Sequence, residues 1–349
     1  MPRGLPPAAT MWLQCGAPRA AARGYNTPLI SSPSSSPSHL PSPMLLRLGT
    51  RASALARWQA DWVAGELRAA GVEVELVPIT TSGDVTLGSL ARVGGQGLFT
   101  KEIQRALLDE RIDLAVHSLK DLPTEPVPGL HLAAVPARAP IGDVLVCSEP
   151  STLDGLGQGA VVGTGSLRRR AQLLHARGDL EIKDLRGNVE TRLAKLDRGE
   201  YDAVILAEAG LRRLGFEERI THVLPTSIML PAVGQGALGL ETRADDRETN
   251  RAVARLNDPA SQSAVVAERS MLAALKGGCL APIGAWARVV GDELVLTGRV
   301  LSSDGAKKLE TERTAPPRDA EALGHAVAES LEFQGAAELV AAARQSDRT

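Results

Sequence analysis

One segment combines glycines, a helix-capping serine and consecutive arginines in a way that favours an anion. In Gly163–Arg170 a short apolar run ends at two glycines, and Ser166 precedes three arginines. Free backbone N–H groups and the positive dipole at a helix N-terminus attract an anion, whereas each arginine there opposes the dipole at a cost of about 0.3–1 kcal/mol. An anionic ligand would offset that cost. The alternative is a basic turn that contacts solvent alone. The segment is not a P-loop, because the Gly-Lys-Ser/Thr ending of that motif is absent.

A second basic segment, residues 184–192, repeats this arrangement. Arg186 lies at the end of a predicted strand and Arg192 in the first turn of the helix that follows. Both would lie at the carboxyl edge of a sheet, where open α/β sheets bind ligands. The alternative is a surface ion pair of an arginine with Asp184 or Glu190.

Residues 117–123 place a histidine, a lysine and a carboxylate directly after a predicted buried strand. Asp121 is the candidate for chemistry, because a carboxylate in a pocket can stabilise a developing cation or move a proton. His117 alone is more typical of a structural histidine. The neighbouring pair of Lys120 and Asp121 is a common arrangement and does not by itself indicate catalysis.

Residues 277–282 put Cys279 on a glycine loop just past a predicted helix. Free cysteines are usually small buried hydrophobic residues. On spacing alone this interpretation is favoured over a reactive thiol, since reactivity requires a lowered thiol pKa that the sequence cannot show.

Composition narrows the class of protein. The chain has 349 residues, 44% of them hydrophobic and 23% charged, which is typical of a globular protein with two or three domains. It lacks an apolar stretch long enough for a transmembrane helix. A net charge of −2 and only 3% aromatic residues argue against a nucleic-acid partner. Three scattered cysteines indicate neither a disulfide framework nor a metal cluster, and favour a reducing compartment.

The hydrophobic pattern alternates between strand and helix signals over most of the chain. This alternation predicts parallel sheets with helices on both faces, in two similar α/β domains. The last part changes type, with a long helix, a hairpin turning at Gly291 and two Ala-rich helices, and predicts a smaller α+β domain. Strands are expected at 45–49, 72–79, 112–116, 144–147, 161–163, 181–185, 203–207, 231–241, 283–290 and 293–301, and helices at 54–70, 101–109, 167–176, 189–197 and 260–275.

Residues 1–43 differ from the rest, because they contain no acidic residue and end in a Ser/Pro run. Such a segment cannot bury enough apolar surface to fold, and disorder is expected. It lacks the compact apolar stretch of a secretory signal. Either it is an organelle transit peptide, or Met44 is the true first residue, which we favour. We therefore expect a cytoplasmic protein, or a plastid one if the segment is a transit peptide.

Eight ordered segments together resemble the porphobilinogen deaminase (hydroxymethylbilane synthase) family. The resemblance runs from Met44 to the C-terminus, and residues 1–43 lie outside it. Two positions depart from the family pattern: Gly165 stands where a second serine is usual, and Gln96 where some members have lysine. The segments are residues 46–53, 94–102, 115–121, 163–169, 185–192, 209–215, 231–236 and 277–282.

The resemblance implies an enzyme of tetrapyrrole biosynthesis. It would condense four porphobilinogen molecules, with release of ammonia, into linear hydroxymethylbilane. It also implies a dipyrromethane cofactor held by a thioether to Cys279, which overturns the interpretation favoured by spacing alone. Asp121 matches the catalytic carboxylate, and a buried Asp121 would stabilise the positive charge on the substrate's pyrrole nitrogen.

The substrate carries acetate and propionate arms, and this accounts for arginines at helix starts. The resemblance assigns cofactor binding to Lys120, Ser166, Arg168, Arg169, Arg186 and Gly187. It assigns substrate binding to Arg51, Ser53, Phe99, Arg192, Arg213 and Gln235. It implies no metal.

The implied fold is two doubly wound, periplasmic-binding-protein-like domains around a cleft, with a third domain carrying the cofactor. The first domain would comprise residues 44–138 with 232–256, the second 139–231 and the third 257–349. We expect a monomer with porphobilinogen as its partner and neither nucleic acid nor membrane. The competing class is a two-domain protein that binds anionic solutes, which would need an export signal and no covalent cofactor.

Overall fold

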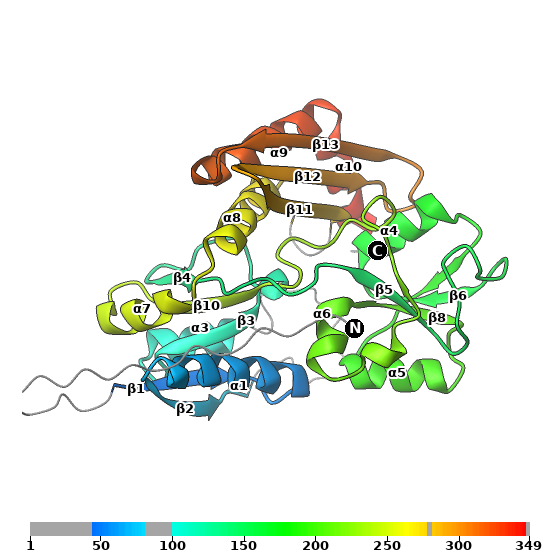
Figure 1. Cartoon of the computed structure of the whole chain (residues 1–349). Coiled ribbons are helices and arrows are strands. Elements are labelled where there is room, and N and C mark those ends of the chain that lie inside the picture. Colours follow the sequence, from blue (N-terminus) through cyan, green and yellow to red (C-terminus); the bar gives the residue numbers. More distant parts are fainter. Residues whose placement is uncertain (1–43, 81–99, 278–280, 347–349) are drawn as a thin grey trace, which may run out of the picture. The chain divides into compact units, whose positions relative to one another are not determined.

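The computed structural model describes residues 44–80, 100–277 and 281–346, which form three β-sheets and the helices packed on them (Figure 1). The predicted leader 1–43, Phe99, Gln96 and Cys279 lie outside the described residues. No helix in the described part of the chain is long and apolar enough to span a membrane.

The first sheet has five strands in the order β2-β1-β3-β10-β4. The first three are parallel, but β10 runs antiparallel to both of its neighbours. The expectation of a wholly parallel sheet is therefore wrong. The reason is that β10 is entered by the chain returning from the second sheet rather than through a crossover helix. The elements are β1 (Leu45–Thr50), α1 (Ala54–Ala69), β2 (Glu73–Pro78), α3 (Lys101–Leu108), β3 (Leu114–Ser118), β4 (Leu130–Ala134), β10 (Leu238–Arg243) and α7 (Arg247–Val253).

The second sheet is also mixed, with the order β7-β6-β8-β5-β9. Strand β6 is parallel to β7 and β8, whereas β5 is antiparallel to β8 and β9. Helices α4 and α5 begin at the residues that the capping signals predict. The elements are β5 (Asp143–Cys147), β6 (Val161–Gly163), α4 (Leu167–Ala176), β7 (Glu181–Lys183), α5 (Val189–Asp197), β8 (Ala203–Ala207), α6 (Glu208–Arg213) and β9 (His222–Val223).

The third sheet is an antiparallel meander of three strands that packs on two long helices through an aliphatic core. The predicted hairpin is confirmed residue for residue, and Gly291 at its turn has a φ of 62°. The third strand, β13, was not predicted, because its alternation is weak. The elements are α8 (Pro259–Ala274), β11 (Ile283–Val290), β12 (Glu293–Leu301), β13 (Lys308–Ala315), α9 (Ala320–Phe333) and α10 (Ala336–Ser346).

Two chain segments, residues 135–142 and 224–237, connect the first sheet with the second. They contact each other, since the Ala139 N–H donates to the Gly236 carbonyl at 3.3 Å. Gly236 has a φ of 86°, and a Cβ there would lie 2.4 Å from the Ala139 oxygen, so only glycine fits. The predicted strand 231–241 begins only at Leu238, because the residues before it form this turn. The bounds of the three domains stay a prediction.

Candidate functional site

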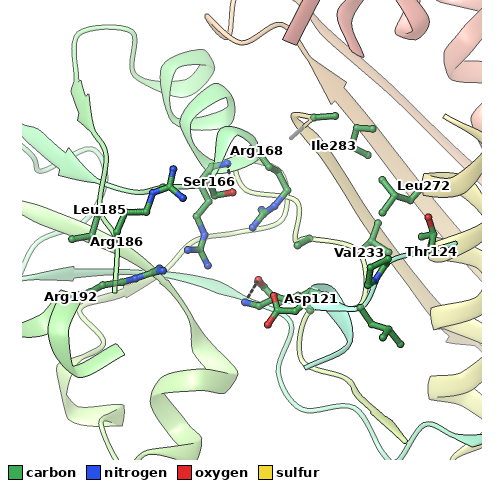
Figure 2. A pocket seen from close by; sticks show the side chains of 18 residues that line it. Asp121, Thr124, Ser166, Arg168, Leu185, Arg186, Arg192, Val233, Leu272 and Ile283 are labelled. Carbon is green, nitrogen blue, oxygen red and sulfur yellow. Dashed lines mark hydrogen bonds between the residues drawn. The ribbon is translucent and has the colours of Figure 1, made fainter. Parts of the chain in front are cut away.

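A pocket of about 300 Å³ brings together many of the polar residues predicted for the site (Figure 2). They come from elements far apart in the sequence, namely the turn after β3, the start of α4, the segment between β7 and α5 with the first turn of α5, and the return segment before β10. The predicted residues among its lining are Lys120, Asp121, Ser166, Arg168, Arg169, Arg186, Arg192 and Gln235.

The pocket has two chemically different walls. Figure 2 shows Arg168, Arg186 and Arg192 on the side of α4 and α5, with Leu272 and Ile283 on the other side. The helix N-terminus adds to the cationic wall, because Ser166 caps α4 by accepting from the Arg169 N–H at 3.4 Å. Such a pocket suits a ligand that carries both carboxylates and flat apolar rings.

Asp121 ends a short 3-10 turn, Leu119–Asp121, that follows β3. The residue lines the pocket but is exposed, so the expectation of a buried carboxylate is wrong. The turn directs the side chain out of the sheet that buries His117 four residues earlier. Among the described residues the Asp121 carboxylate makes no hydrogen bond or ion pair within the protein, and it is therefore available to a ligand.

Lys120 lies beside Asp121, and its Nζ donates to Oε1 of Gln235 at 3.4 Å. Burial lowers the pKa of Lys120 to about 8, and the charge of Arg169 acts in the same direction while that of Asp121 opposes it. A carboxylate bound in the pocket would stabilise the charged ammonium group.

Arg168 and Arg169 are buried and share one carboxylate, that of Asp143 at the start of β5. Nη1 of Arg168 lies 2.7 Å from Oδ2, and Nη2 of Arg169 lies 2.6 Å from Oδ1. Burial alone would raise the pKa of Asp143, but the two arginines hold that pKa far below its usual value. Two cations against one anion leave a net positive charge of one beside the pocket. Sequence reasoning missed Asp143, although an acidic residue opening the apolar strand Asp143–Cys147 was a visible signal.

Arg186 and Arg192 differ in how they are held. Arg186 is exposed and pairs with Asp184 at 2.9 Å, which is the surface ion pair considered as the alternative, yet it also lines the pocket. Arg192 donates from Nε to the Gly187 carbonyl at 2.8 Å and has no carboxylate partner among the described residues. Burial lowers the pKa of Arg192 to about 10, and repulsion from Arg169 contributes. Arg192 is thus a desolvated cation directed to the pocket.

Gln235 joins the two halves of the site. Its side chain is almost fully buried, at 1% exposure, and its Nε2 donates to the Ile141 carbonyl at 2.8 Å and to Oδ1 of Asp143 at 3.0 Å. Its Oε1 accepts from Lys120. The amide is therefore occupied by protein partners in a chain of contacts from Lys120 to Asp143.

Of the predicted residues that the structure describes, Arg51, Ser53, Gly187 and Arg213 do not line this pocket. Ser53 caps α1, with its Oγ accepting from the Ala56 N–H, and Arg51 lies just before that cap. Gly187 has a φ of 116° at the turn before α5. His117 is buried and lies 3.0 Å from a carboxylate oxygen of Glu241, as expected of a structural histidine.

Arg213 lies in a second pocket, of about 300 Å³, beside Trp58 and Trp62 of α1. Its guanidinium carbon is 5.8 Å from the centre of the Trp58 ring, and Nη2 donates to the Gly236 carbonyl at 2.8 Å. Burial lowers the pKa of Arg213 to about 10. Its predicted contact with substrate therefore requires a ligand that reaches beyond the first pocket.

Comparison with models of known protein families shows to which family this chain belongs. Residues 46–251 match the model of the porphobilinogen deaminase dipyromethane cofactor binding domain, and residues 263–332 match that of the porphobilinogen deaminase C-terminal domain. The chain belongs to the porphobilinogen deaminase family. Membership implies a transferase-type enzyme with a dipyrromethane cofactor. The cationic wall and its unpaired Arg192 fit such a polycarboxylate, since carboxylates are the natural partners of desolvated guanidinium groups.

Several solved structures, among them binding proteins for amino acids, are similar to part of this chain. The methionine-binding protein MetQ is 14% identical over 61% of this chain and 89% of its own, with a TM-score of 0.41. ArgBP from T. maritima, as a mutant, is 18% identical over 61% of this chain and 87% of its own, with a TM-score of 0.30. An arginine-specific periplasmic binding protein of Salmonella typhimurium is 14% identical over 61% of this chain and 91% of its own, with a TM-score of 0.35. Likeness at this level carries no argument about function.

Proposed function

We propose that this protein is a porphobilinogen deaminase that condenses four porphobilinogen molecules into linear hydroxymethylbilane and releases ammonia, as a step of tetrapyrrole biosynthesis. The observation that carries the proposal is the pocket in which Asp121, which has no partner among the described residues, faces a wall of guanidinium groups. Family membership supplies the chemistry that such a pocket would serve.

The cofactor would be attached through Cys279. Support comes from Ala281, two residues further along, which lines the pocket. When bound, the dipyrromethane supplies a nucleophilic pyrrole carbon to which the first substrate is joined. Its carboxylates would be held by Lys120, in the turn after β3, and by side chains and backbone on the α4 and α5 side of the pocket, namely Ser166, Arg168, Arg169, Arg186 and Gly187.

Asp121 would act on the substrate directly. As ammonia leaves porphobilinogen, its pyrrole nitrogen becomes positively charged, and a nearby carboxylate stabilises that charge. Such a preorganised charge commonly contributes about 10²–10³ in rate. The same carboxylate can hold the proton that the joined ring loses, because its oxygens are free of protein donors among the described residues.

The rest of the lining would position the reacting rings. Arg192 would bind a substrate carboxylate, which compensates the desolvated guanidinium. Val233, Leu272 and Ile283 give an apolar wall against which a pyrrole ring can pack and from which water is excluded. Arg51, Ser53, Phe99, Arg213 and Gln235 stay predicted substrate contacts. We also propose a cytoplasmic monomer, with the plastid as the alternative location.

Intact mass of the purified chain, measured beside a Cys279→Ser variant, tests this function. We expect an excess equal to two porphobilinogens less two ammonias in the wild type and none in the variant. The same spectrum shows whether residues 1–43 remain. A bare chain that gains no mass with porphobilinogen would support the competing solute-binding protein.

A further inference from the structure

A long helix of the C-terminal region holds the backbone that carries Asp121. Arg269, on α8, donates from Nη1 to the Leu122 carbonyl at 2.8 Å and from Nη2 to the Pro123 carbonyl at 2.6 Å. We propose that Arg269 is a positioning residue for the Asp121 carboxylate. This inference rests on the proposed function, in which Asp121 is the catalytic group.

The turn that carries Asp121 needs an external support. It has three residues, and the Leu122 N–H bond to the Leu119 carbonyl, at 3.1 Å, closes it. The Leu119 N–H is held at the other end by the Ala237 carbonyl at 3.1 Å. Because no described side chain binds the Asp121 carboxylate, the backbone of the turn determines where that carboxylate lies. Arg269 holds the backbone directly after the turn, at Leu122 and Pro123.

The guanidinium group of Arg269 is partly desolvated where it contacts the turn. Burial lowers the pKa of its guanidinium, which the charge of Glu241 partly opposes. In the described part of the chain Arg269 forms no ion pair, and its hydrogen-bond partners are the two carbonyls. A planar guanidinium fixes the directions of two acceptors together, which a flexible ammonium cannot do.

The same helix also forms part of the pocket wall. Leu272, three residues after Arg269 and so on the same face, lines the pocket together with Asp121 and Pro123. Helix α8 therefore sets the distance between the apolar wall and the carboxylate. Loss of the Arg269 contacts would let the turn move relative to the wall while the guanidinium groups of α4 and α5 keep their places.

This arrangement predicts a selective effect on turnover. In Arg269→Met the value of kcat should fall about tenfold or more, because misplacing a catalytic group by about 1 Å can cost up to 10²-fold. KM for porphobilinogen should stay within about threefold of the wild type, since the carboxylate-binding arginines lie elsewhere. Arg269→Lys, which can reach one carbonyl, should have an intermediate kcat.

The experiment is steady-state kinetics of the cofactor-loaded enzyme with porphobilinogen, with far-UV circular dichroism and thermal unfolding of each variant. Arg255→Met is the matched control, because Arg255 also donates to a backbone carbonyl, that of Ala70, and is exposed. It removes the same charge away from the pocket and should keep wild-type kinetics.

A folded Arg269→Met enzyme with wild-type kcat, or one whose loss lies in KM alone, would overturn the positioning role. If Arg269→Met does not fold, Arg269→Lys is the deciding variant. A kcat of at most about one third of the wild-type value, at unchanged KM, supports the role, and a wild-type kcat overturns it. A wild-type enzyme that does not consume porphobilinogen would overturn the proposed function, and the positioning role with it.

Discussion

Nη2 of Arg169 lies 2.6 Å from Oδ1 of Asp143, a carboxylate with 0% exposure. Arg168 occupies the other carboxylate oxygen, so two adjacent arginines at a helix start are held by a single acid. Without this carboxylate, each arginine at the helix start would be repelled by the helix dipole and by the other arginine. Asp143 therefore makes the pair possible while leaving part of its positive charge for a ligand.

The first prediction concerns the stability that Asp143 contributes. Asp143→Asn should lower the free energy of unfolding at pH 7 by about 3–5 kcal/mol, because it leaves two buried cations without their anion. The folded-state pKa of Asp143 is depressed, so its contribution is fully present above the unfolded value of about 3.9 and is lost as pH falls through the folded value. The gap between the wild type and the variant should therefore narrow below about pH 4.

Urea unfolding at pH 7 and at pH 3 checks this. Asp179→Asn is the control, since it removes an Arg–Asp pair on the exposed surface and should unfold close to the wild type. Equal stability of Asp143→Asn and the control at pH 7 would contradict the argument.

The second prediction concerns Asp121. Asp121 is exposed and makes no hydrogen bond or ion pair with the residues that the structure describes, so Asp121→Ala and Asp121→Asn should fold normally, with melting temperatures near that of the wild type. Turnover of porphobilinogen should nevertheless be abolished in Asp121→Ala, and in Asp121→Asn it should fall by at least about 10²-fold. Circular dichroism and an assay of porphobilinogen consumption measure the two properties. Near-normal activity of either variant would remove Asp121 from the mechanism.

The third prediction separates two arginines that are equivalent in the sequence. Arg192→Met should raise KM for porphobilinogen about tenfold or more, because it removes a charge-assisted bond from a desolvated cation. Arg186→Met should cost less in KM, since Arg186 is exposed and already paired with Asp184. Thermal stability should not fall in Arg192→Met, because the lost side chain is a partly desolvated cation without an acidic partner among the described residues. A larger KM effect at Arg186 would reverse the assignment.

Assembly of the cofactor gives a separate measurement on the arginines proposed to hold it. Arg168→Ala and Arg186→Ala are each purified in parallel with the wild type, and their intact masses are compared. Each variant should carry less of the added dipyrromethane, or should stop elongating the pyrrole chain early. Unchanged cofactor content and elongation in both variants would contradict a role of these side chains in binding carboxylates.

The fourth prediction follows from the pKa of Lys120, which burial lowers to about 8. The ammonium group is charged below this pH and neutral above it, so its attraction for a carboxylate bound in the pocket is lost as pH rises through about 8. The value of kcat/KM, which reports groups of the free enzyme, should fall over this range. Lys120→Met should already be low at pH 7 and show no such step, whereas the exposed Lys308→Met should keep the wild-type profile. If the fall of kcat/KM near pH 8 persists in Lys120→Met, another titrating group causes it.

Local structure was predictable from the sequence where local physics decides it. The caps Ser53, Ser166 and Asn188 and the hairpin turn at Gly291 lie where short-range signals put them. The antiparallel direction of β10 was not predictable, because it depends on the chain returning from a sheet built by residues 143–223.

In the candidate site too, local features were predictable and long-range contacts were not. The polar residues that gather around the pocket were found from motifs and from the family resemblance. Their partners were not, because the contact of Asp143 with Arg168 spans 25 residues and that of Arg269 with Leu122 spans 147. Exposure of Asp121 also depends on tertiary packing, which the alternation of apolar residues does not record.

The last prediction concerns Gly165, where the family usually has serine. A Cβ at this position would lie 2.9 Å from the Leu185 carbonyl oxygen and 3.1 Å from Oδ1 of Asp184, so the backbone of the neighbouring segment would have to move. We expect Gly165→Ser to lower the free energy of unfolding by about 1–3 kcal/mol, as overpacking does. Because the displaced segment carries Arg186, KM for porphobilinogen should rise as well. Gly157→Ser is the control, since no atom lies within 4 Å of its added Cβ. Thermal unfolding and kinetics of the two variants measure both effects, and a Gly165→Ser enzyme as stable as the control would show that the segment yields without strain.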